Sequence, residues 1–274
     1  MRDREAIRDY ELLSPHEKQD LLRSSDGAPF LEKLKYDALP RPNYAYGTYH
    51  AALQARALAL PRISVIEFGV AGGNGLVELE SVAFAVERET GVEIDVYGFD
   101  TGEGMPMPVD HRDMPYVWQP GFFKMDVAAL EARLRKAKLV LGNVSTTVPQ
   151  FLERTRPAPI GFASIDLDYY SSTVEALRIF ENRDPSTYLP RIFLYLDDII
   201  GDDWELHSEF AGELLAVKEF SERHTQRKIG KINCLRYKRM LWSPWVEQMF
   251  VLHLFDHPKY CTYVNPKQNW QAPL

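Results

Sequence analysis

The amino-acid sequence predicts an α/β protein with a mostly parallel β-sheet. From residue 63 onward, short runs rich in β-branched and aromatic residues alternate with longer segments that have helical spacing. This alternation is typical of βαβ units, in which right-handed crossovers place helices on both faces of a parallel sheet. Two late strand-like runs have no helix between them, which predicts an antiparallel hairpin that closes the sheet.

The predicted elements follow one another in a regular order. Residues 1–60 mix charged and apolar positions, and 49–60 are rich in strong helix formers, so we expect a helical N-terminal extension. Residues 61–274 form the main domain. Its expected strands span 63–68, 94–99, 139–141, 160–165 and 192–196, with the closing hairpin at 229–237 and 248–255. Its expected helices span 76–89, 127–136, 147–154, 172–182 and 207–224.

The composition is that of a globular protein and argues against two kinds of partner, nucleic acids and membranes. The chain has 274 residues, 45% of them hydrophobic and 26% charged, with a formal net charge of −7. Non-specific nucleic-acid binding depends on positive charge, so we expect no nucleic-acid partner. No apolar run approaches the roughly 20 residues that span a bilayer, and we expect no membrane partner. Two cysteines, Cys234 and Cys261, and a charged N-terminus without a secretory signal predict a cytoplasmic protein.

A glycine-rich turn follows the first expected strand. Residues 67–75 read EFGVAGGNG, and glycines at such a turn let the backbone approach a ligand closely. The dinucleotide fingerprint needs glycines at i, i+2 and i+5, but the second position after Gly69 is Ala71, and no P-loop sequence occurs. Glu67 precedes the turn and Asp100 ends the next strand, which suits a ligand with an amino-acid cation and a ribose. The alternative is that the glycines serve only a tight connection.

These residues carry a resemblance to a known family. EFGVAGGNG at 67–75 resembles the first motif of class I S-adenosylmethionine-dependent methyltransferases, and YGFD at 97–100 resembles their acidic motif after the second strand. The resemblance covers residues 63–255 and implies a Rossmann-like class I methyltransferase fold that binds S-adenosylmethionine. The cofactor-binding residues that it implies are Glu67, Gly69, Gly72, Gly73, Asn74, Asp100 and Thr101.

Pairs of aspartates follow the fourth and fifth expected strands. Asp166 and Asp168 come after the first of these strands, and Asp197 and Asp198 come after the second. Since parallel strands end at the same edge of a sheet, these carboxylates converge beside the glycine turn, where their repulsion favours protons or a bound cation. Oxygen ligands suit Mg²⁺ first, with Mn²⁺ or Ca²⁺ as alternatives. The other interpretation is that the aspartates begin a solvated loop or cap the next helix.

The aspartate pattern resembles one branch of the family. D-x-D-x-Y-S-S-T at 166–173, followed by D-D after the next strand, is similar to the metal-dependent O-methyltransferases of the macrocin O-methyltransferase type, which act on sugar hydroxyls of antibiotics. This resemblance implies that Asp168 is the general base or an acceptor outside the metal's own ligands. The chain departs from the pattern at 181–188, which looks like an insertion, and in the loop after Asp100. The implied metal ligands are Asp166, Asp197 and Asp198.

Further features are weaker candidates for the site. His207 and His253 are candidate catalytic residues, although a helix-start or surface role for His207 and a core or edge role for His253 fit the sequence as well. Tyr169 and Tyr170 either line an acceptor pocket or pack in the core. Residues 101–123 contain repeated glycines and prolines without periodicity, and a loop of this length beside a ligand site predicts a lid.

Taken together, these features predict an enzyme. We expect a methyltransferase that transfers a methyl group from S-adenosylmethionine to a hydroxyl of a small-molecule acceptor, natural-product or sugar-like, with assistance from Mg²⁺ or another divalent cation. The sequence leaves a homo-oligomer open. Two alternatives also stay open: a metal-independent N- or C-methyltransferase whose aspartates position the substrate, and a catalytically silent cofactor-binding protein.

Overall fold

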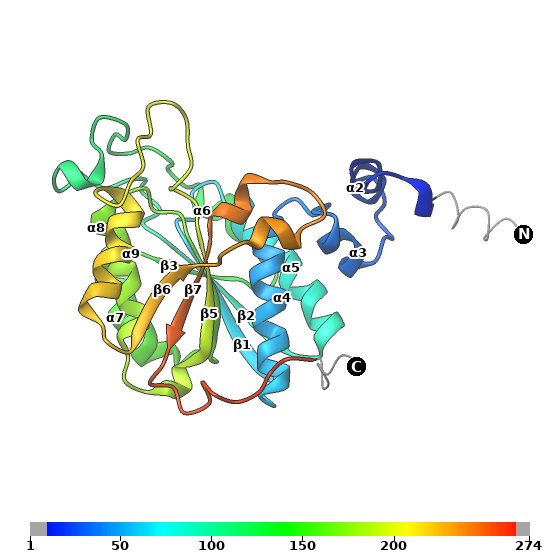
Figure 1. The fold of residues 1–274 in the computed structure, drawn as a ribbon. Helices are drawn as coiled ribbons and strands as arrows, with labels where there is room; N and C mark the ends of the chain where they lie inside the picture. The colour runs from blue at the N-terminus through cyan, green and yellow to red at the C-terminus, as the bar shows by residue number, and fades with distance from the viewer. Residues whose placement is uncertain (1–9, 267–274) are drawn as a thin grey trace, which may run out of the picture.

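A seven-stranded sheet organises residues 10–266, which are the part of the chain that the computed structural model describes (Figure 1). The strand order is β3-β2-β1-β4-β5-β7-β6; β1 to β5 are parallel, and β7 runs antiparallel to both of its neighbours. The predicted parallel sheet with a closing antiparallel hairpin is therefore confirmed. The strands are β1 Arg62–Phe68, β2 Glu93–Asp100, β3 Lys138–Leu141, β4 Ile160–Ile165, β5 Tyr188–Leu196, β6 Arg227–Lys231 and β7 Met249–Leu254.

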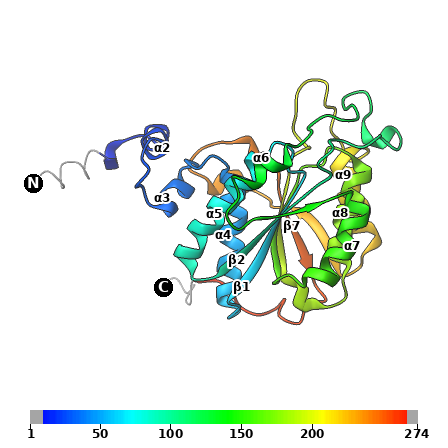
Figure 2. The same cartoon turned by 180° about the vertical axis from the view of Figure 1, so that it is seen from behind.

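Helices cover both faces of the sheet (Figures 1 and 2). One face carries α4 (Pro42–Ala57) and α5 (Asn74–Thr90). The other carries α7 (Val144–Thr155), α8 (Tyr170–Leu177) and α9 (Gly212–Arg223). Among the helices of residues 10–266, none is both long enough and apolar enough to cross a lipid bilayer.

The central strands explain the two helical layers. In β1, the side chains of Ile63 and Val65 belong to the core under α4 and α5, whereas Ile66 and Phe68 belong to the core under α7, α8 and α9. All four side chains are fully buried. A strand that is apolar on both faces is stable only when helices cover each of them.

The helices before the first strand form two different parts. The helices α2 (Pro15–Arg23) and α3 (Phe30–Lys35) project away from the sheet in both views (Figures 1 and 2). In contrast, α4 packs directly on β4 and β5, and a Cβ atom on its Gly47 would lie 2.3 Å from the ring of Phe162. The predicted boundary at residue 60 separates an N-terminal extension from the main domain. In the structure, α4 lies before this boundary but packs on the sheet as part of its core.

Some element boundaries differ from the prediction. The fifth strand begins at Tyr188 instead of 192, because residues 181–188 form a short connection with a 3-10 turn that leads directly into the strand. The helix expected from residue 207 begins at Gly212, whose φ of +59° marks a sharp entry to the helix. The preceding residues 199–211 form a loop that contributes to the cavity described below. Further elements are shorter than expected, among them β6, α6 (Val127–Glu131) and α8, which ends at Leu177.

Candidate active site

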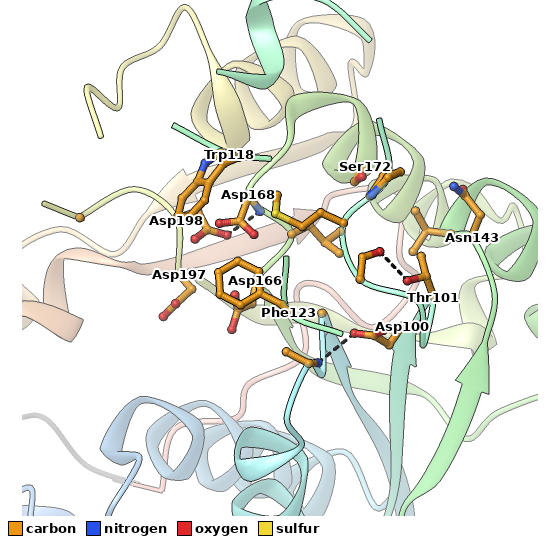
Figure 3. Close-up of a pocket in the computed structure, with 18 of the residues that line it drawn as sticks. Asp100, Thr101, Trp118, Phe123, Asn143, Asp166, Asp168, Ser172, Asp197 and Asp198 are labelled. Carbon is orange, nitrogen blue, oxygen red and sulfur yellow. Dashed lines mark hydrogen bonds between the residues drawn. The ribbon is translucent and has the colours of Figure 1, made fainter. Parts of the chain in front are cut away.

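A cavity of about 460 Å³ lies at the carboxyl ends of the parallel strands (Figure 3). This is the edge of an α/β sheet where ligands usually bind, because the loops that leave parallel strands meet there. Its size is in the range of a cofactor or drug-sized ligand. The residues that line it follow β1 to β5 and include Gly69, Ala71, Asp100, Thr101, Asn143, Val144, Asp166, Leu167, Asp168, Asp197 and Asp198.

The glycine turn after β1 is shaped by the strand beside it. Gly69 has a φ of +84°, and a Cβ atom on it would lie 1.6 Å from the backbone oxygen of Asp166. Only glycine fits there, because the ends of β1 and β4 approach each other closely. Asp100, at the end of the neighbouring strand β2, stabilises the turn. Its Oδ2 accepts hydrogen bonds of 2.9 Å from the backbone N–H groups of Val70 and Ala71.

Part of the predicted cofactor set reaches the cavity. Gly69, Asp100 and Thr101 line it. The other three turn residues lie outside its wall and serve packing or hydrogen bonding. A Cβ atom on Gly73 would meet the side chain of Leu130 at 2.3 Å, and the Asn74 side chain accepts a hydrogen bond of 2.8 Å from Arg133. Gly72 offers its backbone oxygen to the same arginine at 3.5 Å.

Glu67 lies beneath the turn in a buried polar cluster. Its side chain is 1% exposed, and its Oε1 accepts a hydrogen bond of 2.7 Å from the hydroxyl of Tyr44, which in turn accepts one of 3.1 Å from Ser164. Its Oε2 has no partner among residues 10–266. Burial raises the pKa of Glu67 to about 8.

The raised pKa of Glu67 predicts a pH-dependent stability. A carboxyl group with a higher pKa in the folded than in the unfolded chain contributes most stability below about pH 4.5, and this contribution is lost as the pH rises through about 8. We expect the melting temperature to fall over this window, and to fall less in Glu67→Gln, whose amide oxygen still accepts from Tyr44. Exposed Glu89→Gln is the control for thermal melts at each pH. Identical pH profiles in wild type and Glu67→Gln would contradict the prediction.

Three aspartates form a tight cluster on the far side of the cavity. One carboxylate oxygen from each of Asp166, Asp197 and Asp198 lies within 4.8 Å of the other two. Burial, followed by repulsion from the neighbouring carboxylates, raises the pKa values of Asp166 and Asp198 well above the usual range. An oxygen-donor set of this charge and spacing fits a hard divalent cation, which would remove the repulsion.

Asp168 lies beside this cluster in an unusual backbone conformation. Its φ is +58°, in the left-handed region, and its N–H donates a hydrogen bond of 2.7 Å to Oδ2 of Asp198. Burial, followed by the charge of Asp166, raises the pKa of Asp168 to about 7. Non-glycine residues with positive φ concentrate at functional sites, and the carboxyl group of Asp168 faces the cavity (Figure 3).

The wall contributed by residues 101–123 is apolar. Trp118 and Phe123 of this loop line the cavity beside the aspartates, whereas Thr101 and Asn143 lie across from them (Figure 3). The loop is tied to α8, because the buried carboxylate of Asp113 accepts hydrogen bonds of 2.8 Å from the N–H and hydroxyl of Ser171. The apolar wall could not be found from the sequence, since the loop has no periodicity that orients its side chains.

Glu213 is a buried acid that the sequence did not single out. It lies at the start of α9 with 0% exposure, and its Oε1 accepts a hydrogen bond of 3.3 Å from the N–H of Leu167, between the two aspartates that follow β4. Burial, followed by the charge of Asp198, raises the pKa of Glu213 well above its usual range. An acidic residue in the first turn of a helix is ordinarily solvated, so the sequence carries no signal of this position.

Neither histidine lines the cavity. The side chain of His207 is 6% exposed and contacts Glu205, a lining residue, with its Nε2 3.1 Å from the Glu205 carboxylate. His253 pairs with Arg191 near the start of β5 and contacts the Tyr260 hydroxyl, so it lies at the opposite edge of the sheet. This corrects the expectation for His253, because β7 runs antiparallel and its end points away from the site. Tyr169 and Tyr170 are buried and are not among the residues that line the cavity; Tyr170 packs in the core and its hydroxyl donates a hydrogen bond of 2.6 Å to Glu219.

Comparisons with known proteins identify the fold. No protein-family model matches the chain, and a search of curated proteins finds no match. The crystal structure of CalS11, a calicheamicin methyltransferase, matches with a TM-score of 0.53 and 21% sequence identity, covering 87% of this chain and 90% of that chain. The chain has a methyltransferase fold. The structure of the O-methyltransferase NovP matches with a TM-score of 0.50 and 13% identity, covering 77% of this chain and 79% of that chain.

The methyltransferase fold accounts for the grouping of the site residues. The Rossmann-like architecture expected from the glycine and aspartate motifs is confirmed at the level of the fold. In this topology, the glycine turn, Asp100 and the aspartates after β4 and β5 leave parallel strands at one edge, so residues more than 100 positions apart line the same cavity. This shared edge is the structural basis for the function proposed below.

Proposed function

We propose that the protein transfers a methyl group from S-adenosylmethionine to a hydroxyl of a small-molecule acceptor, with assistance from a divalent cation. The observation that carries this proposal is a single cavity with the glycine turn and Asp100 on one side and a three-aspartate cluster on the other. The fold is shared with structures described as a calicheamicin methyltransferase and an O-methyltransferase, which supports the same reaction class.

The glycine-turn side of the cavity suits the cofactor. When bound, S-adenosylmethionine supplies an electrophilic methyl group on its sulfonium. Asp100 accepts two backbone N–H groups at Oδ2 and that of Gly102 at Oδ1, so Oδ1 keeps a lone pair for a ribose hydroxyl. Thr101 and Asn143 border the adjoining part of the cavity. Gly69 allows the backbone to come close without a side chain.

Replacing Asp100 by alanine tests this placement. Loss of hydrogen bonds to a charged group costs about 1.5 to 3 kcal/mol, so we expect the dissociation constant of S-adenosylhomocysteine to rise by about 10- to 150-fold. Asp95→Ala, on the same strand but paired with Arg62, is the control and should bind normally. Isothermal titration calorimetry measures both variants, and an unchanged affinity in Asp100→Ala would remove Asp100 from the cofactor site.

The aspartate side suits the cation and the proton transfer. Asp166, Asp197 and Asp198 would hold a divalent cation, most simply Mg²⁺, which lowers the pKa of a hydroxyl that reaches it. Asp168 is next to this cluster and can take the hydroxyl proton, which makes the acceptor oxygen a better nucleophile.

The apolar wall indicates the kind of acceptor. Trp118 and Phe123 line the cavity beside the aspartates, and Met105 of the same loop also lines it, so the acceptor presents a hydroxyl to the carboxylates and an apolar face to the loop. A natural product or a sugar attached to an aromatic group has both features. The loop 101–123 rises beside 199–211 above this edge in both views, a position from which it can cover a bound acceptor (Figures 1 and 2).

The direct test is methyl transfer from labelled S-adenosylmethionine to a panel of catechols, phenols and aryl glycosides, with Mg²⁺ or with EDTA. We expect labelled product from at least one acceptor with Mg²⁺, and its loss with EDTA. Labelled product that is insensitive to EDTA would replace the proposal by a metal-independent methyltransferase. Binding of cofactor without transfer to any acceptor would favour a catalytically silent protein.

A further inference from the structure

The segment before α4 brings a cation close to Glu67, which precedes the glycine turn, and Arg41 itself is not among the residues that line the cavity. Arg41 directly precedes α4, is half-buried, and has its guanidinium carbon 5.0 Å from the centre of the Tyr44 ring. Tyr44 in turn donates a hydrogen bond of 2.7 Å to Glu67 at the end of β1. The start of α4 is therefore fixed over the acidic residue that precedes the glycine turn.

Arg41 stands among carboxylates without forming a close ion pair. Its positive charge interacts with Glu67, Asp166 and Asp197, and from α5 also with Glu78. Within residues 10–266, no carboxylate oxygen lies within 4.0 Å of its guanidinium nitrogens. A guanidinium has five N–H donors in a planar fork, so Arg41 retains the capacity to bind an incoming carboxylate.

The long axis of the cavity would bring the amino-acid end of the cofactor toward Arg41. The cavity runs from Asn143 and Asp100, after β3 and β2, past Gly69 to Asp166. A cofactor whose ribose is held by Asp100 extends its amino-acid end past Gly69 toward β4. That end carries an ammonium and a carboxylate. The surrounding acids attract the ammonium but repel the carboxylate, which needs a cation of its own.

We infer that Arg41 binds the α-carboxylate of the cofactor's amino-acid end, and this inference rests on the proposed function. The stacking of Arg41 on Tyr44 orients the guanidinium fork, and the hydrogen bond from Tyr44 to Glu67 couples this orientation to the glycine-turn motif. A residue from the helical segment before the sheet thus completes the cofactor site. Neither the glycine turn nor the strand ends supply such a cation.

Two ligands separate this role from a general effect on the pocket. S-adenosylhomocysteine carries the α-carboxylate, whereas 5′-deoxy-5′-methylthioadenosine keeps the adenosine and sulfur but lacks the amino acid. In Arg41→Met, we expect the dissociation constant of S-adenosylhomocysteine to rise by about tenfold or more, the range for a lost charge-assisted hydrogen bond, with that of methylthioadenosine unchanged. Arg41→Lys should lose less, because it keeps the charge but not the planar fork.

Calorimetry with both ligands gives decisive outcomes. The control is Arg56→Met, which removes an exposed arginine from the other end of α4 and should change neither affinity. Equal weakening of both ligands in Arg41→Met, or no weakening of either, would overturn the assignment while leaving cofactor binding established. If the wild-type protein bound neither ligand, the proposed function itself would fail, and the role of Arg41 with it.

Discussion

Asp197→Asn and Asp198→Asn are each expected to lower methyl transfer by a factor of about 10² to 10⁴, with little change in the affinity for S-adenosylhomocysteine. A divalent cation contributes several kcal/mol of charge stabilisation to such a reaction, and each substitution replaces one of its proposed carboxylate ligands by a neutral amide. The proposed cofactor residues lie on the other side of the cavity, so cofactor binding should persist. Turnover and Mg²⁺ titration by calorimetry measure the two effects separately.

Asp203→Asn is the matched control for this pair, because Asp203 lies in the exposed loop shortly after the cluster. It should retain full activity and Mg²⁺ affinity. If EDTA and both cluster substitutions left methyl transfer unaffected, metal assistance would be refuted. The aspartates would then position the substrate, as in a metal-independent methyltransferase.

Asp168→Asn is expected to reduce turnover by a factor of about 10² to 10⁴ while Mg²⁺ and S-adenosylhomocysteine still bind. This range is typical of the loss of a general base. Asparagine suits the site sterically, since it has nearly the same shape as aspartate and tolerates the positive φ of +58° found there. Its backbone N–H can still donate to Asp198.

A parallel loss of Mg²⁺ binding and turnover in Asp168→Asn would contradict the role of general base. It would show instead that Asp168 belongs to the metal site. Thermal melts of the variant distinguish both results from a loss of folding, because a folded variant keeps a cooperative transition near that of the wild type.

Much of the fold was predictable because the central strands have unambiguous patterns. The runs at 63–68 and 160–165 are mostly apolar, and the structure buries β4 completely and β1 from Ile63 onward. The boundaries that failed depend on tertiary contacts. Tyr188 joins β5 because it pairs with Ile160 of β4, and a sequence pattern alone does not contain that pairing.

The sequence predicts a site residue only where the order of strands and helices alone determines where that residue lies. Asp100, Asp166 and Asp197 follow parallel strands, so their convergence follows from the order of elements. The antiparallel hairpin was predicted, but the pattern does not show which of its two strands opposes the parallel strands, which explains the misplacement of His253. Arg41 was also missed, since it precedes a helix outside the strand pattern and only its packing on Tyr44 brings it close to Glu67.

Titration of the wild-type protein with S-adenosylhomocysteine in an isothermal calorimeter tests the central claim most directly, since it needs no knowledge of the acceptor. We expect saturable binding of one molecule per chain, weakened in Asp100→Ala and retained in Asp197→Asn. Absence of binding by the folded wild-type protein at millimolar ligand would contradict the assignment of the cavity to this cofactor.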